Sequence, residues 1–146
     1  MEQSSPQPAR TPSPVMGLYD APMWQSVREH GMQLQCCTDC GRFQYPPGPS
    51  CSHCLSPELQ WRPVSGRGRI LSWVVFHKSY LDAYPAPYNV VAVRLEEGVV
   101  MVSNLEPPVP QDNWIGTPVR MTYVTMEDGF VLPRFVVDDV QTGRSP

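Results

Sequence analysis

The sequence predicts a mainly β protein with one short N-terminal helix, a small cysteine-rich module and a C-terminal barrel of five strands. The 146 residues contain 18 prolines and 10 glycines, which excludes a bundle of long helices. Two Cys-x-x-Cys pairs lie close together in the first half, and five runs rich in β-branched and aromatic residues fill the second half. We therefore divide the chain into residues 1–16 (a disordered tail), 17–33 (the helical segment), 34–63 (the cysteine module), 64–140 (the barrel) and 141–146 (a short tail).

The N-terminal tail has four prolines among Gln, Ser and Thr, without the basic start or apolar segment of a signal peptide. No apolar run in the chain approaches the ~18 residues that a membrane span needs, so we expect no membrane association. We expect a cytoplasmic protein. In a reducing cytosol, clustered cysteines serve metal binding or redox chemistry more often than disulfides.

The helical segment has recognisable end signals. Asp20 suits the N-cap, Pro22 suits the first turn, and Gly31 marks the end of a helix of about three turns. One face of this helix carries an apolar stripe, made of Met23, Trp24, Val27 and His30. Such a stripe must pack either on the barrel or on another subunit.

The barrel strands are expected at residues 69–78, 88–95, 99–105, 119–125 and 130–137. Glu96-Glu97-Gly98 and Glu127-Asp128-Gly129 predict two antiparallel hairpins, because a tight hairpin turn favours a residue with positive φ. Pro133 lacks an N–H, which predicts a bulged or edge position for the last strand. Gly66-Arg67-Gly68 reads as a turn before the first strand. Residues 79–87 and 106–116 are loops long enough to carry function.

The strongest chemical signal is the pattern Cys-x-x-Cys, ten residues, Cys-x-x-Cys, formed by Cys37, Cys40, Cys51 and Cys54. Each pair presents two thiolates on one turn, and two facing turns close a tetrahedral shell around a zinc ion. A closed shell leaves no position for substrate, so we expect one structural zinc per chain that contributes folding energy. Iron in the same ligand set remains an alternative.

Two further residues of the module could replace a ligand. Cys36 precedes a complete pair and should point to the opposite side of an extended chain, as a partly buried free thiol. His53 lies inside the second pair, where solvent-facing residues are usual. Gly41 follows the first pair and permits a tight turn, whereas Leu55 takes the same place after the second pair.

No nucleophile elbow, phosphate-binding loop, dinucleotide fingerprint or metalloprotease motif occurs, so we expect no active site in this chain. Residues 42–78 carry five basic residues against Glu58 alone. This excess suits a phosphate-bearing ligand, and it equally suits the charge of about −2 on a zinc ion held by four thiolates.

Single-stranded nucleic acid is an alternative ligand, because aromatic residues lie close to the same basic block: Trp61, Trp73, Phe76, Tyr80 and Tyr84. The net charge of −3 and the single lysine of the chain weaken the phosphate-driven part of such binding. We therefore consider nucleic acid the less favoured ligand.

The order of these parts resembles a known family. The helix around Met23-Trp24 is followed by LQCCTDCGRFQYPP, CSHC, WRPVSGRGRI, PAPYNVVAVRLEEGVVMVSNL, IGTPVRMTY and LPRF. Between about residues 20 and 140 the chain closely resembles the Zn-ribbon/OB-fold family of acyl-CoA-associated proteins. The resemblance implies a rubredoxin-like zinc ribbon, a C-terminal OB-fold barrel and metal ligation by the same four cysteines.

The resemblance also implies a role. Members of this family accompany thiolase-like enzymes, including thiolases and steroid side-chain aldolases, in hetero-oligomers, and some accompany acyl-CoA hydratases; the partner supplies the catalytic residues. We therefore expect an auxiliary subunit rather than an enzyme, with degradation of steroids or other hydrophobic acyl chains as the context. We expect the partner to contact Met23, Trp24, Val27, Tyr80, Tyr84 and Tyr88. Arg67 and Arg69 are expected near the phosphates of coenzyme A.

Overall fold

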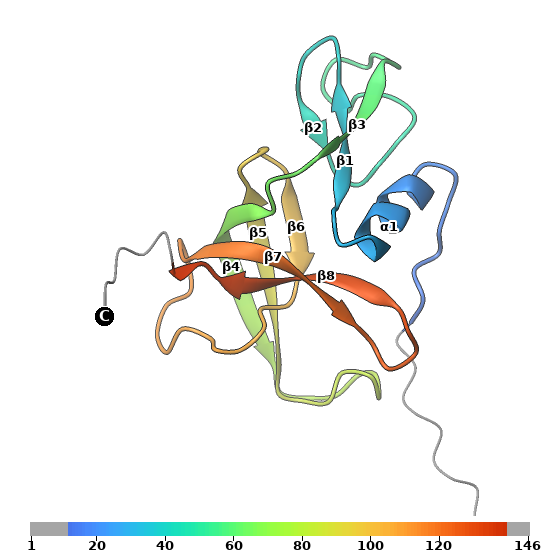
Figure 1. Ribbon diagram of the computed structural model, residues 1–146. Coiled ribbons are helices and arrows are strands. Elements are labelled where there is room, and N and C mark those ends of the chain that lie inside the picture. Colours follow the sequence, from blue (N-terminus) through green and yellow to red (C-terminus); the bar gives the residue numbers. More distant parts are fainter. Residues whose placement is uncertain (1–11, 140–146) are drawn as a thin grey trace, which may run out of the picture.

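The structure, a computed structural model, describes residues 12–139 (Figure 1). Its elements are α1 (Ala21–Arg28), β1 (Gln33–Cys37), β2 (Phe43–Gln44), β3 (Leu59–Pro63), β4 (Arg67–Phe76), β5 (Tyr88–Leu95), β6 (Val100–Ser103), β7 (Pro118–Thr125) and β8 (Val131–Val137). The strands form two sheets, in the orders β2-β1-β3 and β6-β5-β4-β7-β8. Residues 1–11 of the expected N-terminal tail and the expected tail 141–146 lie outside the described residues.

Helix α1 is shorter than the sequence predicts. It has eight residues, about two turns rather than three. Asp20 does occupy the N-cap position, but its side chain accepts the N–H of Gly17 instead of capping the helix. The helix ends at Arg28, and the left-handed residue that terminates it is His30, with a φ of 58°, rather than Gly31. The N–H of Gly31 then bonds to the carbonyl of Ser26, which completes a Schellman ending.

The small sheet of β1, β2 and β3 forms the cysteine module, which lies above the barrel in Figure 1. Its central strand β1 pairs with β2 through Gln35 and Cys36, and with β3 from Gln33 to Cys37. Buried Gln35 also ties the following loop to this sheet, since its side chain bonds to both the N–H and the carbonyl of Gly48. Short strands and a polar loop network explain why this module needs a further stabilising element.

The five-stranded sheet confirms both predicted hairpins. Strands β5 and β6 form an antiparallel pair around Gly98, in which Val91 lies opposite Ser103. Strands β7 and β8 form another around Gly129, in which Val119 lies opposite Val137. Both glycines have positive φ, 90° and 82°. β8 lies at the edge of the sheet order, as its Pro133 predicts.

The sheet curls into a half-barrel that nearly closes on itself. Leu105, just after β6, forms a parallel bridge with Phe135 of β8. The carbonyl of Phe135 accepts the N–H of Glu106 at 2.7 Å, and its own N–H donates to Asn104 at 3.0 Å. Inside the curl Phe135 is fully buried. Trp114, from the long loop before β7, is buried and stacks on Trp73 with 4.5 Å between ring centroids, so this part of the loop covers the barrel.

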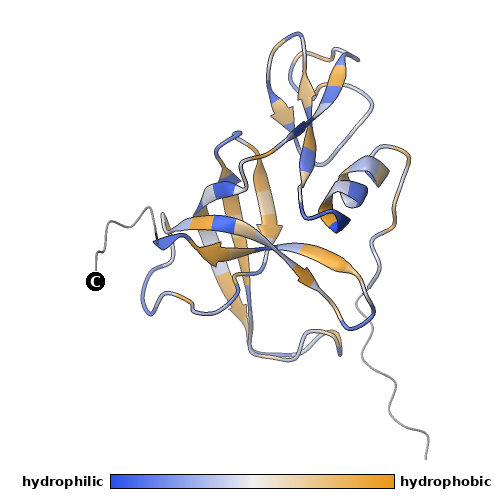
Figure 2. Cartoon of the chain, in the orientation of Figure 1, coloured by the Kyte–Doolittle hydropathy of each residue, from blue (hydrophilic) through white to orange (hydrophobic). Residues whose placement is uncertain are grey.

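One apolar core unites the helix, the start of the small sheet and the barrel. Figure 2 shows apolar residues concentrated on the barrel strands. The buried cluster extends from there to Met23 and Val27 of α1, to Met32, and to Leu34 of β1. Met23 and Val27 of the apolar stripe therefore pack on their own chain, while Trp24 is only partly buried. The described residues include no helix with the length and apolar character of a membrane span.

The Gly66-Arg67-Gly68 segment is more than a turn. Only Gly66, with φ of 72°, precedes the strand, because β4 already begins at Arg67. Gly68 is buried opposite Leu95, and a Cβ atom there would clash with the backbone of Arg94 and lie 2.8 Å from Val93 Cγ1. A residue without a side chain is required because β4 and β5 approach closely where the sheet curls.

Candidate metal centre

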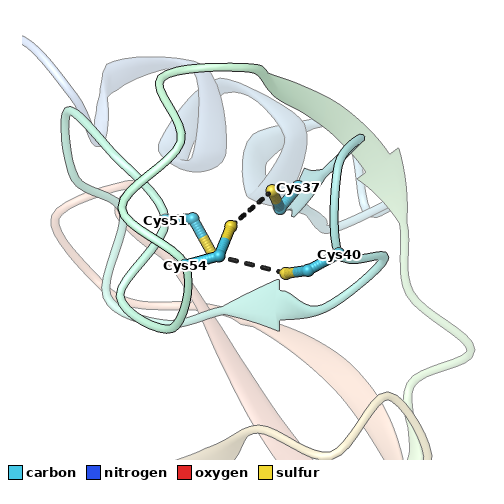
Figure 3. A group of neighbouring side chains, drawn as sticks. All are labelled: Cys37, Cys40, Cys51 and Cys54. Carbon is cyan, nitrogen blue, oxygen red and sulfur yellow. Dashed lines mark hydrogen bonds between the residues drawn. The ribbon is translucent and has the colours of Figure 1, made fainter.

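Four cysteine sulfurs converge between the two turns of the small module (Figure 3). Cys37 and Cys54 have their sulfurs 3.6 Å apart, as do Cys40 and Cys51, and all four sulfurs lie within 4.8 Å of one another. Tetrahedral zinc with Zn–S bonds of about 2.3 Å needs sulfurs about 3.8 Å apart. The four cysteines are therefore positioned to bind one metal ion, and the prediction that they share one site is confirmed.

The two turns that carry these ligands have the same local structure. Cys37 ends β1, and its carbonyl accepts the N–H of Gly41 at 2.9 Å; the carbonyl of Cys51 accepts the N–H of Leu55 at 3.0 Å. Backbone N–H groups also point at the ligands, since the N–H of His53 lies 3.4 Å from the Cys51 sulfur. Such donors favour thiolates, which are the form that binds metal.

The four thiols also perturb one another. Backbone N–H groups of Cys54 and His53 lower the pKa of Cys51 to about 6. For Cys54 the N–H of Ser56 favours the thiolate, but desolvation and the three neighbouring sulfurs outweigh it and raise its pKa to about 12. Crowded acids compete for ionisation in this way, and a divalent cation is the chemical partner that allows all four to be thiolates together.

The other two candidate ligands of the module face elsewhere. The Cys36 sulfur lies 3.6 Å from the carbonyl oxygen of Gly41, outside the four-sulfur cluster. This thiol is fully buried rather than partly buried. His53 is exposed, and its Nδ1 lies 3.1 Å from the guanidinium of Arg42.

The structure divides the helix residues that the sequence assigned to a partner. Met23 and Val27 are 4% and 0% exposed within this chain, so the expectation that a partner contacts them is wrong. The reason is that the stripe they form packs on the barrel core. Trp24 is only partly buried, with its ring edge-on to Phe130 at 6.1 Å. Both rings line a notch of about 150 Å³ beside the helix.

The predicted tyrosines gather around the loop between β4 and β5. Tyr88 stacks on Phe76 at 5.0 Å, Tyr84 lies 5.8 Å from Tyr88, and Tyr80 meets Phe76 edge-on at 6.0 Å. Tyr80 is 65% exposed. A groove of about 340 Å³ runs from Tyr84 and Tyr88 to the β7–β8 turn.

Arg67 and Arg69 both lie exposed on β4, two residues apart and so on one face of the strand. Nε of Arg67 is 3.8 Å from the buried carboxylate of Asp138, and Arg69 donates to the carbonyl of Gly116 at 3.0 Å. Two further arginines, Arg94 and Arg120, lie opposite them on β5 and β7. Arg94 and Arg120 were not identified from the sequence, because only the strand register shows that they are neighbours of Arg67 and Arg69. Aligning the predicted strands as an antiparallel sheet could have revealed them.

Comparison with known proteins agrees with this architecture. The rubredoxin-like zinc ribbon domain of ChsH2 matches residues 24–60, and the C-terminal OB-fold domain of ChsH2 matches residues 61–124. A solved structure described as "Ltp2-ChsH2(DUF35) aldolase" superposes with a TM-score of 0.78 and 30% identity, over 86% of this chain and 98% of that one.

Relatives of known description differ in length. A 3-oxo-4,17-pregnadiene-20-carboxyl-CoA hydratase alpha subunit of Mycobacterium tuberculosis is 34% identical over 72% of this chain. The chain spans only 33% of that subunit and 42% of a probable enoyl-CoA hydratase alpha subunit of Thermomonospora curvata. A DUF35 domain-containing scaffold protein of Pyrococcus furiosus is 27% identical over 75% of this chain and 84% of its own length. The chain therefore belongs to the ChsH2 (DUF35) family of zinc-ribbon and OB-fold proteins.

Proposed function

We propose that this chain is a non-catalytic, zinc-binding subunit that binds and supports a thiolase-like enzyme, a thiolase or an aldolase, acting on acyl-CoA in the cytoplasm. The observation that carries the proposal is the likeness to the ChsH2 (DUF35) chain of an aldolase complex, which this chain matches over 98% of that chain's length. The name of the mycobacterial relative supports steroid or other hydrophobic acyl-chain degradation as the context.

The metal centre supports a structural rather than a catalytic role. Four thiolates complete a tetrahedral shell, so a zinc ion held there has no open position for water or substrate. Two of the three histidines are engaged in packing or surface contacts: His30 stacks on Tyr123 at 5.2 Å, and His53 contacts Arg42. The catalytic residues would then come from the partner.

We propose that Trp24 and the tyrosines in and beside the loop between β4 and β5 contact that partner. Trp24 keeps part of its ring at the surface, and Tyr80, Tyr84 and Tyr88 form a connected aromatic surface with a groove beside it. Partly exposed aromatic residues next to a concave surface are the usual anchors of protein interfaces. The loop and the β7–β8 turn lie at the end of the barrel away from the ribbon (Figure 1), which leaves them accessible to a second protein.

We also propose that Arg67 and Arg69 approach the phosphates of coenzyme A at an entrance shared with the enzyme. Both guanidinium groups are exposed, and arginine binds phosphate through two parallel hydrogen bonds. The remaining donors of each group stay open to a ligand after the contacts with Asp138 and Gly116.

Two alternatives have specific observations behind them. A hydratase partner is supported by the relatives named as hydratase alpha subunits, although the chain spans less than half of each. Single-stranded nucleic acid is supported only by the OB-fold and its aromatic residues. The rings of Phe76 and Tyr88 stack on each other, and Trp73 stacks on Trp114, so these faces are occupied rather than open to bases.

Co-expression with a thiolase-like enzyme encoded beside this chain tests the proposal. We expect the two proteins to co-elute in size exclusion with about one zinc per chain, and the enzyme to lose acyl-CoA cleavage or solubility when it is expressed alone. Assays of acyl-CoA hydration and of single-stranded DNA binding on the same fractions test the alternatives. A zinc-loaded monomer that elutes separately and leaves the enzyme unaffected contradicts the proposal.

Tyr80→Ala and Trp24→Ala test the proposed contact surface. Removal of an aromatic anchor costs roughly 2 kcal/mol or more of binding energy, so each variant should weaken co-purification more than tenfold. Val102→Ala is the matched control, because Val102 is 65% exposed on β6, outside the proposed surface. Unchanged co-purification of both aromatic variants contradicts this surface while leaving the wider proposal intact.

A further inference from the structure

Four arginines meet on the outer face of the barrel, although the sequence places them on three separate strands. Arg69 of β4 is directly opposite Arg94 of β5, and Arg67 of β4 is directly opposite Arg120 of β7. Directly opposite residues of antiparallel strands project from the same face, with Cβ atoms about 4.5–5.5 Å apart. All four are exposed. We call these four residues the arginine cluster.

The arginine cluster is only partly balanced by acids. Asp138 lies beside Arg67, and Glu96 borders the hollow between Arg69 and Arg94. Within residues 12–139, Arg94 and Arg120 take part in neither of the two ion pairs formed. Like charges directly opposite each other destabilise a sheet. An anionic ligand would relieve that repulsion.

The backbone beneath the arginine cluster allows β4 and β5 to approach each other closely. Gly68 lies between Arg67 and Arg69 and faces inward, and its missing side chain allows β4 and β5 to curl together. On the outer face a hollow of about 320 Å³ opens between the two strands, bordered by Arg69, Leu71, Arg94 and Glu96. A small ligand group therefore has room between the two guanidinium groups.

We propose that the arginine cluster binds a ligand that carries two or more phosphate groups, with Arg94 and Arg120 as binding residues. The two opposed pairs lie two residues apart along β4, about 6.5–7 Å, so each pair receives a different phosphate. A phosphate dianion balances the charge of two guanidinium groups and accepts paired hydrogen bonds from them, whereas a single carboxylate balances only one of the two charges. The inference rests on the proposed function, since it extends the site of Arg67 and Arg69.

Tripolyphosphate is the probe for the arginine cluster, titrated calorimetrically into the zinc-loaded full chain at low salt. We expect saturable binding that weakens as sodium chloride is raised. Arg94→Gln combined with Arg120→Gln should lower the affinity about tenfold or more. Arg62→Gln is the matched control, because Arg62 is an exposed arginine on β3 outside the cluster, and it should leave the affinity unchanged.

Lysine at the same two positions keeps the charge but loses the paired hydrogen bonds, so Arg94→Lys with Arg120→Lys should bind with intermediate affinity. A thermal unfolding curve on each variant verifies that the fold is retained. Equal affinity of the glutamine variant and the wild type overturns the inference. So does binding of polyglutamate as tight as that of tripolyphosphate, which would assign the cluster to an acidic protein segment.

The same variants separate this inference from the proposed function. Loss of tripolyphosphate binding in a chain that still co-purifies with the thiolase-like enzyme supports the arginine cluster and leaves the subunit role standing. Normal tripolyphosphate binding by a chain that pairs with no such enzyme contradicts the subunit role alone. Absence of tripolyphosphate binding by a chain that does form the complex overturns the arginine cluster alone.

Discussion

Gly41 and Leu55 occupy the same position in the two cysteine turns. Each follows a Cys-x-x-Cys pair, and each donates its N–H to the carbonyl of the first cysteine of that pair, at 2.9 and 3.0 Å. Both adopt left-handed backbone conformations, with φ of 73° and 64°. The turn therefore demands this conformation at both sites, while only one of them has the residue that adopts it without strain.

Leu55→Gly should stabilise the zinc-loaded chain by about 0.5–1 kcal/mol. A left-handed leucine costs about 1–2 kcal/mol, of which the greater freedom of glycine in the unfolded state cancels about 0.5–1 kcal/mol. Leu55 is 77% exposed, so little packing is lost. Thermal unfolding at saturating zinc measures the change.

Gly41→Leu is the reciprocal control. Nothing lies within 4 Å of a Cβ atom built on Gly41, so a clash of that atom does not contribute to the effect. We expect a loss of about 0.5–1 kcal/mol, the reverse of Leu55→Gly, because the freedom of glycine in the unfolded state again offsets part of the strain. Equal stability of the two reciprocal variants would show that the turns differ in a way their backbone angles do not reveal.

Cys40→Ser should lower the zinc content from about one ion per chain to nearly none. The three-stranded module has short strands and little apolar core of its own, so amide exchange should accelerate most in β1, β2 and β3. Metal analysis and hydrogen exchange measure the two effects. Cys36→Ala is the control, because the Cys36 sulfur lies outside the four-sulfur cluster and its loss should leave the metal bound.

The features that could be predicted from the sequence are local in the chain. Gly98 and Gly129 indicated their hairpins because the turn and both strands are neighbours in sequence. The metal centre could be predicted equally well, since each Cys-x-x-Cys turn is a self-contained unit. The residue that terminates α1 differed from the predicted one by one position, because the left-handed conformation expected at Gly31 is adopted by His30.

The features that could not be predicted depend on tertiary contacts. Met23 and Val27 would form an apolar stripe whether the helix packed on this chain or on a partner. Only the position of the barrel decides that this chain covers them. Arg69 and Arg94 are 25 positions apart and meet only through the register of β4 with β5. A β-bulge near Ile70 changes that register further along the strand, and a bulge has no firm sequence signal.

Gly68→Ala should destabilise the chain by about 2–3 kcal/mol, because the added methyl group must displace β5 at its contact with Val93 and Arg94. The urea midpoint should fall with an unchanged slope. Gly31→Ala is the matched control, since a Cβ atom there meets nothing within 4 Å and Gly31 has no positive φ. It should change stability by no more than about 0.5 kcal/mol.

Asn89→Ala should cost about 2–3 kcal/mol, because the Asn89 amide acts as a strand partner for Leu105. Its Nδ2 donates to the carbonyl of Leu105 at 2.8 Å, and its Oδ1 accepts the N–H of Leu105 at 2.7 Å. Leu105 is 2% exposed, so water cannot easily replace these bonds.

Urea denaturation measures the loss in Asn89→Ala, and hydrogen exchange locates it. The substitution should accelerate exchange at the amides of Glu106 and Phe135 more than at the amides within β4 and β5. The reason is that Leu105 bridges to Phe135 where the half-barrel closes. Asn113→Ala is the matched control: Asn113 is exposed and its side chain accepts only the N–H of Ile115. A uniform increase in exchange across the sheet would mean that Asn89 stabilises the whole fold rather than the closure between Leu105 and Phe135.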